Sequence, residues 1–252
     1  MVEIGKREQT QHAVSVDMIG LSASELLATY DLLGDTAAWV KDTQFQYRWA
    51  NRTFLLNHSL SDLSELVGKT DQEISPAYLA DLYQSDDASV LNGQTIVARV
   101  EPVGTYEAMP RWNQTWKRPL HDGKGNVVAA FGLSRQLPET NAPEFPFSDL
   151  VPVLNHMRTH TARQVTNREL AQLAHLSVRA FERKFKRHIK MTPAQFIGRL
   201  RITRAAADLC DTTDAINEIA YRHGFSDQSH LTREFRKHFG KTPKSYRSTY
   251  QG

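Results

Sequence analysis

The sequence predicts an α+β protein: an antiparallel sheet with helices comes first, and an all-α domain of two helix-turn-helix units joined by a linker helix follows. Three observations support this prediction. A unit of helical pattern occurs twice after residue 165, with its copies 49 to 50 residues apart. Short apolar or alternating runs, typical of strands, flank a helix-like section between residues 23 and 137. A proline-containing stretch separates the two halves.

The chain of 252 residues divides into four predicted segments. Residues 1–20 are polar and unpatterned, so we expect a flexible tail there. Residues 21–137 form one small domain, and residues 150–252 form a second. Residues 138–149 contain Pro143 and Pro146, which interrupt any regular pattern and predict a linker.

The first predicted element of the N-terminal domain is a helix. Ser22 and Glu25 have the spacing of a capping box, and the helix that they open has four apolar side chains on one face: Leu26, Leu27, Tyr30 and Leu33. This face could pair two subunits or pack on the domain's own sheet, and the sequence leaves both open. Strand-like runs follow, then a helix-like section from residue 62 to residue 91, and residues 122–126 predict a hairpin turn.

The second copy of the repeat, residues 216–247, shows the pattern of the C-terminal domain most clearly. Ile219 lies on an apolar helix face, and Gly224 supplies the left-handed residue that ends this helix. We predict that Ser226 caps the next helix, in which Leu231 and Phe235 point inward. The other face of that helix keeps polar side chains: Gln228, Ser229, Thr232 and Arg233. A helix with one apolar seam and such a polar face suits the major groove of DNA.

Residues 170–196 repeat this pattern with an offset of 49 before the turn and 50 after it, so the second copy has one extra residue there. The matching residues of the first copy are Leu170, Ser177, Phe181, Phe185 and Thr192, which correspond to Ile219, Ser226, Leu231, Phe235 and Thr242. The first copy departs in one place, because Lys190 stands where the second copy has Gly240. A left-handed lysine costs about 1 kcal/mol, so we expect the first unit to turn differently there.

A single helix is predicted between the two copies, over residues 193–209. Thr192 and Gln195 have capping-box spacing, and Pro193 takes the first helical position. The apolar residues recur at helical spacing: Phe196, Leu200, Ala205, Ala206 and Leu209. A helix of this length spans about 25 Å. It would hold both units on one side of a DNA duplex, where successive major grooves lie about 34 Å apart.

Charge divides the chain into an acidic and a basic half. Residues 148–252 hold 19 Lys and Arg against 9 Asp and Glu, a net of +10, whereas residues 1–147 have a net of −7. A basic helical domain is typical of a protein that binds a polyanion. The acidic half and the lack of an apolar run of about 18 residues argue against a membrane role. The lone Cys210 excludes an intrachain disulfide, so we expect a cytoplasmic protein.

Patterns for metal binding and catalysis are weak. His156 and His160 stand four residues apart but lack the glutamate of a zinc-protease helix, so we predict a structural role and no metal site. We interpret Cys210 as a small buried hydrophobe rather than a redox switch. No nucleophile–base pair or phosphate loop is evident in the sequence, so an enzyme is not predicted.

The second copy resembles the helix-turn-helix of the AraC/XylS family of transcription regulators, almost position for position over residues 216–247. This resemblance implies a regulator whose partner is a double-stranded DNA operator. It also implies, as the positions opposite the apolar seams do, that seven side chains face base edges: Arg179, Glu182, Arg183, Gln228, Ser229, Thr232 and Arg233. Residues at the helix ends are predicted to meet phosphates: Lys186, Arg187, Thr192, Lys237, Lys241, Thr242 and Lys244.

The N-terminal half resembles a PAS domain in residues 40–54 with 66–71, and in residues 112–126 with 127–133. This resemblance implies a domain that binds a small organic molecule, pairs two chains, or both. Nine aromatic residues are candidates for the lining of a pocket: Trp39, Tyr47, Trp49, Phe54, Tyr78, Tyr83, Trp112, Trp116 and Phe131. PAS domains often end in Asp-Ile-Thr, and this chain has Gln136-Leu137-Pro138 instead, which puts the usual coupling to the next domain in doubt.

No cofactor is predicted for this domain. No cysteine precedes residue 150, which excludes a cysteinyl-flavin adduct and a thioester-bound chromophore. We interpret His58 as a capping or solvated histidine rather than a haem ligand.

The leading hypothesis is a sequence-specific transcription regulator, a homodimer, that a small organic ligand controls through the PAS-like domain. The alternative keeps the DNA binding but makes the front domain a structural dimeriser with a filled core. We expect a mainly apolar ligand that acts by changing how two chains pair. The reason is that a proline-containing linker transmits force poorly.

Overall fold

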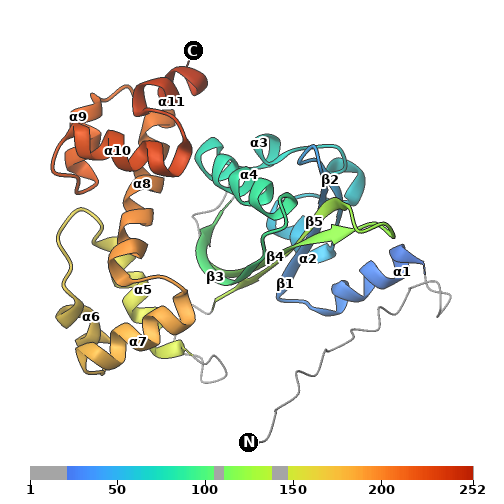
Figure 1. Ribbon diagram of the computed structural model, residues 1–252, viewed down its shortest axis with the longest axis horizontal. Helices are drawn as coiled ribbons and strands as arrows, with labels where there is room; N and C mark the ends of the chain where they lie inside the picture. Colours follow the sequence, from blue (N-terminus) through green and yellow to red (C-terminus); the bar gives the residue numbers. More distant parts are fainter. Residues whose placement is uncertain (1–21, 105–110, 138–146, 252) are drawn as a thin grey trace, which may run out of the picture.

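The computed structural model describes residues 22–104, 111–137 and 147–251, and two parts of the chain lie side by side in it (Figure 1). The front domain, within residues 22–137, is a five-stranded sheet with helices packed against it. The helical domain, residues 147–251, contains helices alone among its described residues and is built along the long helix α8. The predicted α+β order, with the sheet first and the helices after it, is confirmed.

All strand pairs of the front domain are antiparallel, in the order β2-β1-β5-β4-β3. The strands are β1 (Thr36–Asp42), β2 (Tyr47–Ala50), β3 (Ile96–Val103), β4 (Arg111–His121) and β5 (Val127–Gln136). The predicted hairpin turn joins β4 to β5, and Asp122 holds it by accepting the amides of Lys124 and Asn126 at 2.8 and 2.9 Å. Glycine is required at Gly132, because a Cβ there would lie 2.4 Å from the Trp39 ring.

The predicted N-terminal helix is shorter than expected. α1 (Ala23–Ala28) begins at the capping box of Ser22 and Glu25, as predicted, and passes into a 3-10 turn, η2 (Thr29–Leu32). The Tyr30 ring lies 6.2 Å from the Trp49 ring and 5.1 Å from the Phe131 ring, so this end packs on its own sheet. A short helix, α2 (Arg52–Asn57), follows the first two strands. The helix-like section after residue 62 is divided into three elements: η3 (Leu63–Glu65), α3 (Asp71–Ile74) and α4 (Ala77–Leu91).

The helical domain contains the two predicted helix-turn-helix units. After η4 (Ser148–Leu150) and α5 (Val151–Thr159), the first unit is α6 (Asn167–Leu173) with α7 (Val178–Ile189). α8 (Pro193–Asp211) leads to the second unit, α9 (Ile216–Arg222) with α10 (Gln228–Phe239), and α11 (Pro243–Tyr250) follows it. The predicted capping box opens α8, and its predicted apolar face is buried: Phe196, Leu200, Ala205, Ala206 and Leu209. None of the described helices could span a membrane.

The turn of the second unit differs from the prediction at its cap. Asp227, not Ser226, caps α10, since its Oδ1 accepts the amide of His230 at 2.7 Å. Ser226 is therefore the extra residue of the second copy, and it precedes the cap. The first unit makes the left-handed turn with His175, at φ 53°, where the second unit has Gly224 at φ 76°.

The expectation that Lys190 makes the first unit turn differently was wrong. Lys190 has φ 64° and Gly240 has φ 69°, so both units make the same left-handed turn after the recognition helix. Ile189, next to the turn, is fully buried. Burying one such side chain contributes about 1.5–3 kcal/mol, which exceeds the strain of about 1 kcal/mol that a left-handed lysine carries.

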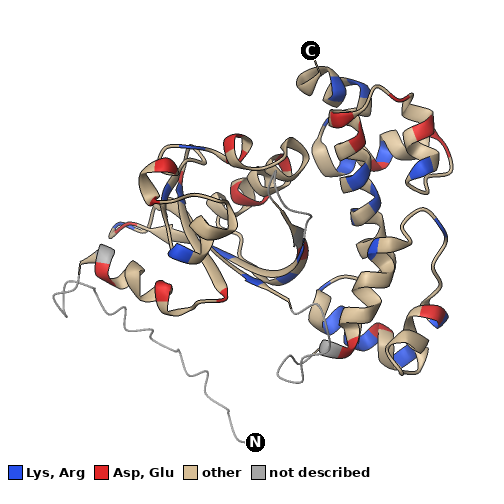
Figure 2. Ribbon diagram, turned by 180° about the vertical axis from the view of Figure 1, so that it is seen from behind, with Lys and Arg blue, Asp and Glu red and all other residues tan. Residues whose placement is uncertain are grey.

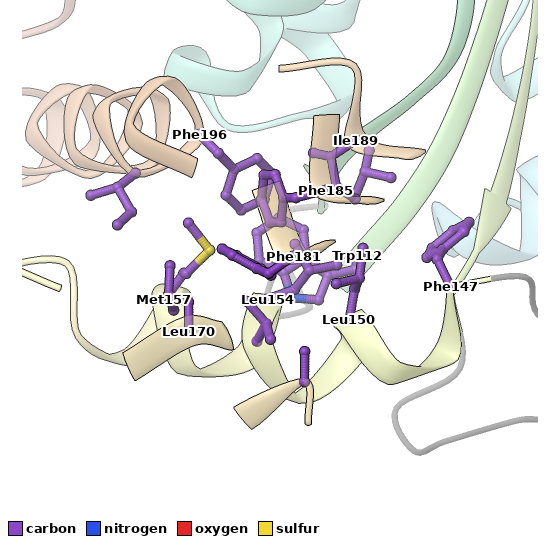
Figure 3. Packing of buried hydrophobic residues seen from close by; sticks show 14 of the residues in the cluster. Trp112, Phe147, Leu150, Leu154, Met157, Leu170, Phe181, Phe185, Ile189 and Phe196 are labelled. Atoms are coloured by element: carbon purple, nitrogen blue, oxygen red, sulfur yellow. The ribbon is translucent and has the colours of Figure 1, made fainter. Parts of the chain in front are cut away.

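The two domains share a hydrophobic core (Figure 3). The front domain contributes Val100, Trp112 and Leu137 to a buried cluster that continues into the helical domain, where it includes Leu150, Leu154, Met157, Leu170, Phe181, Phe185, Ile189 and Phe196. The Trp112 ring lies 5.2 Å from the Phe196 ring, and its Nε1 donates to Oδ1 of Asn155 at 3.2 Å. The helical domain therefore packs against β3 and β4 at one end of the sheet, which covers the edge strand β3.

This shared core corrects the expectation of a weak mechanical connection between the halves. Most of the predicted linker, residues 138–146, lies outside the described residues. Leu137 and Phe147 on either side of it are 3 % exposed, and both belong to the shared core. Packed side chains therefore join the domains in addition to the linker, and separating the domains would expose buried aromatic surface.

Candidate nucleic-acid interface and ligand pocket

The recognition helix of the second unit, α10, has a buried seam and an exposed polar face. The side chains of Leu231 and Phe235 have no exposed surface. Thr232 is half-buried, and its hydroxyl donates to the carbonyl of Gln228 at 2.8 Å. The rest of the predicted base-reading set on this helix is exposed: Gln228, Ser229 and Arg233. This face of α10 is therefore open to a partner, and the front domain does not cover it.

The recognition helix of the first unit, α7, is built in the same way. Phe181 and Phe185 are fully buried, and Arg179 and Arg183 are exposed on the opposite face. Glu182 is exposed as well, but its Oε1 accepts a hydrogen bond from Nδ2 of Asn167 at 2.5 Å. The Glu182 carboxylate is thus held against α6, an interaction that the sequence pattern did not indicate.

The linker helix α8 sets the distance between the two units. It has 19 residues, which corresponds to a length of about 28 Å. Figure 2 shows Lys and Arg residues distributed over the whole helical domain. Successive major grooves on one face of a DNA duplex lie about 34 Å apart.

The residues predicted to meet phosphates lie at helix ends. Thr192 and Thr242 are N-caps, and their hydroxyls accept the amides of Gln195 and Ser245 at 3.3 and 3.1 Å. These hydroxyls are therefore used in capping, and the backbone at each helix start is the group left for an anion. The other members of the set are exposed cations: Lys186, Arg187, Lys237, Lys241 and Lys244.

Two histidines, His156 of α5 and His160 just after this helix, take part in a polar cluster. The His156 and His160 rings stack with centroids 4.1 Å apart, and Nε2 of His156 lies 2.8 Å from Oε1 of Glu169. Arg163 pairs with the same carboxylate, and its hydrogen bond lowers the pKa of Glu169 to about 2. No group of three or more metal-ligating side chains occurs among the described residues. This cluster ties α5 to α6.

A cavity of about 190 Å³ lies in the front domain, between the sheet and helices α2 to α4. Four of the nine predicted aromatic residues line it: Trp39, Tyr47, Phe54 and Tyr83. The other five do not: Trp49, Tyr78, Trp112, Trp116 and Phe131. Strand alternation explains part of this result, since neighbouring residues point to opposite faces of a sheet. Trp116 and Phe131 line a hollow on the outer face instead.

The other three predicted pocket residues that do not line the cavity pack elsewhere. Trp112 belongs to the core that the two domains share. Tyr78 packs against the core of the second unit, which lies beside α4. Trp49 faces Tyr30 of the N-terminal turn. Aromatic composition indicated a core, and tertiary packing decided which core each ring joined.

Beside the aromatic lining, a buried ionic network forms one wall of the cavity. Nζ of Lys41 donates to Asp71 at 2.5 Å and to Asp87 at 2.7 Å, and Nζ of Lys117 donates to Asp87 at 2.5 Å. The hydroxyl of Tyr47 donates to Asp71 at 2.7 Å. Strand alternation could have revealed Lys41 and Lys117, since each lies two residues from a side chain that lines the same cavity.

The ionic network stays charged. Burial opposes the positive charge of Lys41, but the carboxylates of Asp71 and Asp87 outweigh it and raise the lysine pKa. Burial acts against ionised Asp87 as well, and the two lysines nevertheless lower its pKa to about 2. Burial and the Asp71 carboxylate raise the pKa of Tyr47, so its hydroxyl keeps the proton that it donates. Lys41 and Asp87 therefore keep their charges inside the protein.

Comparisons with known proteins identify both parts of the chain. A model of a helix-turn-helix domain matches residues 170–249, and a model of the PAS fold matches residues 32–142. The transcriptional activator RhaS of Enterobacter sp. (strain 638) is 34% identical over 91 residues, which make up 36% of this chain and 33% of RhaS. The matched region thus spans about a third of this relative, which is named as a regulator and not as an enzyme.

Solved structures are similar to part of the chain. One is a transcriptional regulator with an AraC-type DNA-binding domain from Chromobacterium violaceum, which is 27% identical, has a TM-score of 0.39 and covers 40% of this chain and 91% of that one. Another is the DNA-binding domain of AdpA in complex with a target DNA, which is 29% identical with a TM-score of 0.39 and covers 41% and 93%.

Proposed function

We propose that this chain, which belongs to the AraC family by its helix-turn-helix domain and has a PAS fold in front of it, is a transcription regulator that reads a specific DNA operator. One observation carries the proposal: α7 and α10, which lie at the two ends of one linker helix, both have a buried apolar seam and an exposed polar face. The net charge of +10 in residues 148–252 adds affinity for any DNA sequence.

Specificity in this proposal comes mainly from two arginines. Arg183 of α7 and Arg233 of α10 are exposed on the faces opposite the apolar seams. An arginine that bonds both O6 and N7 of guanine contributes about 1–3 kcal/mol of discrimination. Glu182 joins the readout after its bond to Asn167 breaks, and the complete base-reading set is Arg179, Glu182, Arg183, Gln228, Ser229, Thr232 and Arg233.

The proposal includes a small organic ligand in the front-domain cavity. An apolar cavity of about 150 Å³ admits benzene, so the cavity of about 190 Å³ has room for one substituted ring. Trp39 and Phe54 offer apolar surface to such a ring. Described residues engage two of the three protons on each ammonium group of Lys41 and Lys117. A mainly apolar ligand that carries a hydrogen-bond acceptor therefore suits the cavity.

We also propose that the regulator is a cytoplasmic homodimer. Leu32 is 85% exposed and Val97 is 57% exposed. Val97 lines the hollow on the outer face of the sheet, and Leu33, next to Leu32, lines it too. Exposed apolar side chains around one hollow are typical of a surface that pairs. Pairing two chains on one operator would multiply their affinities.

Selection of operators from a random DNA pool tests this function. The full chain should enrich one consensus sequence, whereas Arg183→Ala and Arg233→Ala should each relax part of it. Arg48→Ala is the matched control, because Arg48 is an exposed arginine of the front domain, and it should leave the consensus unchanged. Failure of the full chain to enrich any sequence would refute the proposal. Mass spectrometry of the denatured protein, purified from its native cells, tests for a bound small molecule.

A further inference from the structure

Glu101 of β3 lies between the cavity and the linker helix. Its side chain is 4% exposed and lines the cavity. Its Oε2 accepts from Nε of Arg99 at 2.9 Å and lies 3.5 Å from Nη2 of Arg199. Arg199 belongs to α8, which carries both helix-turn-helix units. One buried carboxylate thus contacts the ligand cavity and the helix that sets the position of both recognition helices.

Glu101 offsets part of the cost of burying the Arg199 guanidinium. Burial lowers the pKa of Arg199 and the positive charge of Arg99 lowers it further, while Glu101 acts in the opposite direction. Arg99 has a second partner, Asp86 of α4, at 2.8 Å between Nη1 and Oδ1. Loss of Glu101 would therefore leave two neighbouring guanidinium groups with one carboxylate between them. A buried charge without its partner is strongly unfavourable, so Arg199 would move.

The helix on the other side of the cavity also contacts the helical domain. Asp87 of α4 bonds the two lysines of the cavity wall. Asp81, on the same helix, accepts the hydroxyl of Tyr250 at 2.7 Å, and Tyr78 packs against the core of the second unit. Two elements, β3 and α4, thus contribute both to the walls of the cavity and to the contacts with the helical domain.

We propose that Glu101 relays the occupancy of the cavity to the DNA-binding domain. A ligand that also carries a hydrogen-bond donor would bond Glu101 in competition with Arg199, and this tie between α8 and the front domain is then lost. This inference rests on the proposed function and names the contact through which its regulation acts. It makes DNA affinity respond within one chain, without a change in how chains pair. Because coupling between two sites is reciprocal, DNA changes ligand affinity by the same factor.

The test uses a side chain in place of the unidentified ligand. Val103 lines the cavity two residues after Glu101 on the same strand face, so Val103→Phe places a ring beside the carboxylate. In the full chain, we expect Val103→Phe to change the Kd for the selected operator at least about fivefold. We also expect faster amide hydrogen exchange in residues 193–211. Thr115→Leu, which also enlarges a side chain of the cavity lining, is the second variant should the larger ring prevent folding.

Two further variants interrupt the relay. Glu101→Gln should shift the Kd in the same direction as Val103→Phe, and combining the two should add less than about twofold. Arg199→Met should also abolish the response to Val103→Phe. Asp35→Asn is the matched control, since it removes a partly exposed ion pair with Arg135 elsewhere in the sheet, and it should preserve the response.

The outcomes separate this proposal from the proposed function. If the native chain enriches no DNA sequence in the selection, the proposed function fails. If the native chain binds but neither Val103→Phe nor Thr115→Leu changes the Kd, the relay is refuted. An equal response to Val103→Phe with and without Glu101 would refute it as well.

Discussion

The two helix-turn-helix units have one sequence pattern but different surroundings. At equivalent positions, the Phe196 ring lies 5.2 Å from Trp112 of the front domain, whereas the Tyr246 ring lies 5.0 Å from Phe235 of its own unit. The core of the first unit therefore continues into the sheet, and the second unit has a separate core with Tyr78 at its border. The comparison shows that the repeated pattern specifies the helix-turn-helix fold of each unit, but not which other part of the protein packs against that unit.

The largest effect that separates the units is expected from Trp112→Ala. Removing this ring opens a cavity in the shared core, and the free energy of unfolding should fall by about 3–5 kcal/mol. Amide hydrogen exchange should rise in α5 and α7 and remain nearly unchanged in α10. Trp49→Ala is the control, because Trp49 is half-buried outside that core, and it should cost less. Equal acceleration of both units would show that the anchoring is not confined to the first.

Arg183→Ala and Arg233→Ala compare the units as readers of DNA. Each should lose about 1–3 kcal/mol of discrimination between the selected operator and a variant with its guanine replaced. The two losses should map to different base positions, roughly one helical turn apart. Competition binding with single-site operator variants measures them. If Arg183→Ala alone leaves every preference intact, the first unit binds the backbone without reading bases.

Tyr250→Phe tests how the second unit is held by the front domain. The variant deletes the hydroxyl that donates to Asp81 at 2.7 Å. Because Tyr250 is half-buried, we expect the free energy of unfolding to fall by about 1 kcal/mol. Amide hydrogen exchange should become faster in α11 and stay unchanged in α7. Tyr221→Phe removes a hydroxyl from a side chain that is 62% exposed and should be neutral.

The left-handed turns after α7 and α10 can be compared by exchanging the residue type in each, and the expected change in stability is smaller. Lys190→Gly should stabilise the first unit by about 1 kcal/mol, since the same φ costs glycine no steric strain. Gly240→Ala should destabilise the second unit by a similar amount, although there is space for the added Cβ. Thermal unfolding of both variants provides the measurement. A destabilised Lys190→Gly protein would mean that the lysine side chain contributes more than its backbone costs.

The smallest expected effects concern single phosphate contacts. Lys186→Ala and Lys237→Ala each remove one exposed cation beside a recognition helix. Each should weaken binding to all DNA sequences alike and reduce the slope of log K against log salt by about 1. Titrations at several salt concentrations measure this slope. A changed operator preference with an unchanged slope would count against the division between readout and affinity.

Local patterns predicted much of the fold. The repeat gave both units and α8, because apolar spacing, Pro193 and the Thr192 cap act within a few residues of each other. The hairpin turn followed from the polar residues 122–126 in the same way. The prediction was wrong at Lys190. Lysine has a low propensity for the left-handed conformation, but Lys190 adopts it beside the buried Ile189. The extra residue of the second copy concealed Asp227 as the cap.

The sequence by itself determined the order of the domains, the two units with their exposed arginines, and the charge difference between the halves. These properties depend on periodicity and composition, which are set by residues close together in the sequence. The tertiary structure alone decided that Trp112 joins the helical domain, that Lys41 meets Asp71 and Asp87, and that Glu101 lies beside Arg199. Such contacts join residues 30 to 98 positions apart. They form because burying apolar surface and pairing buried charges act through space, and no local pattern records which distant partner lies near.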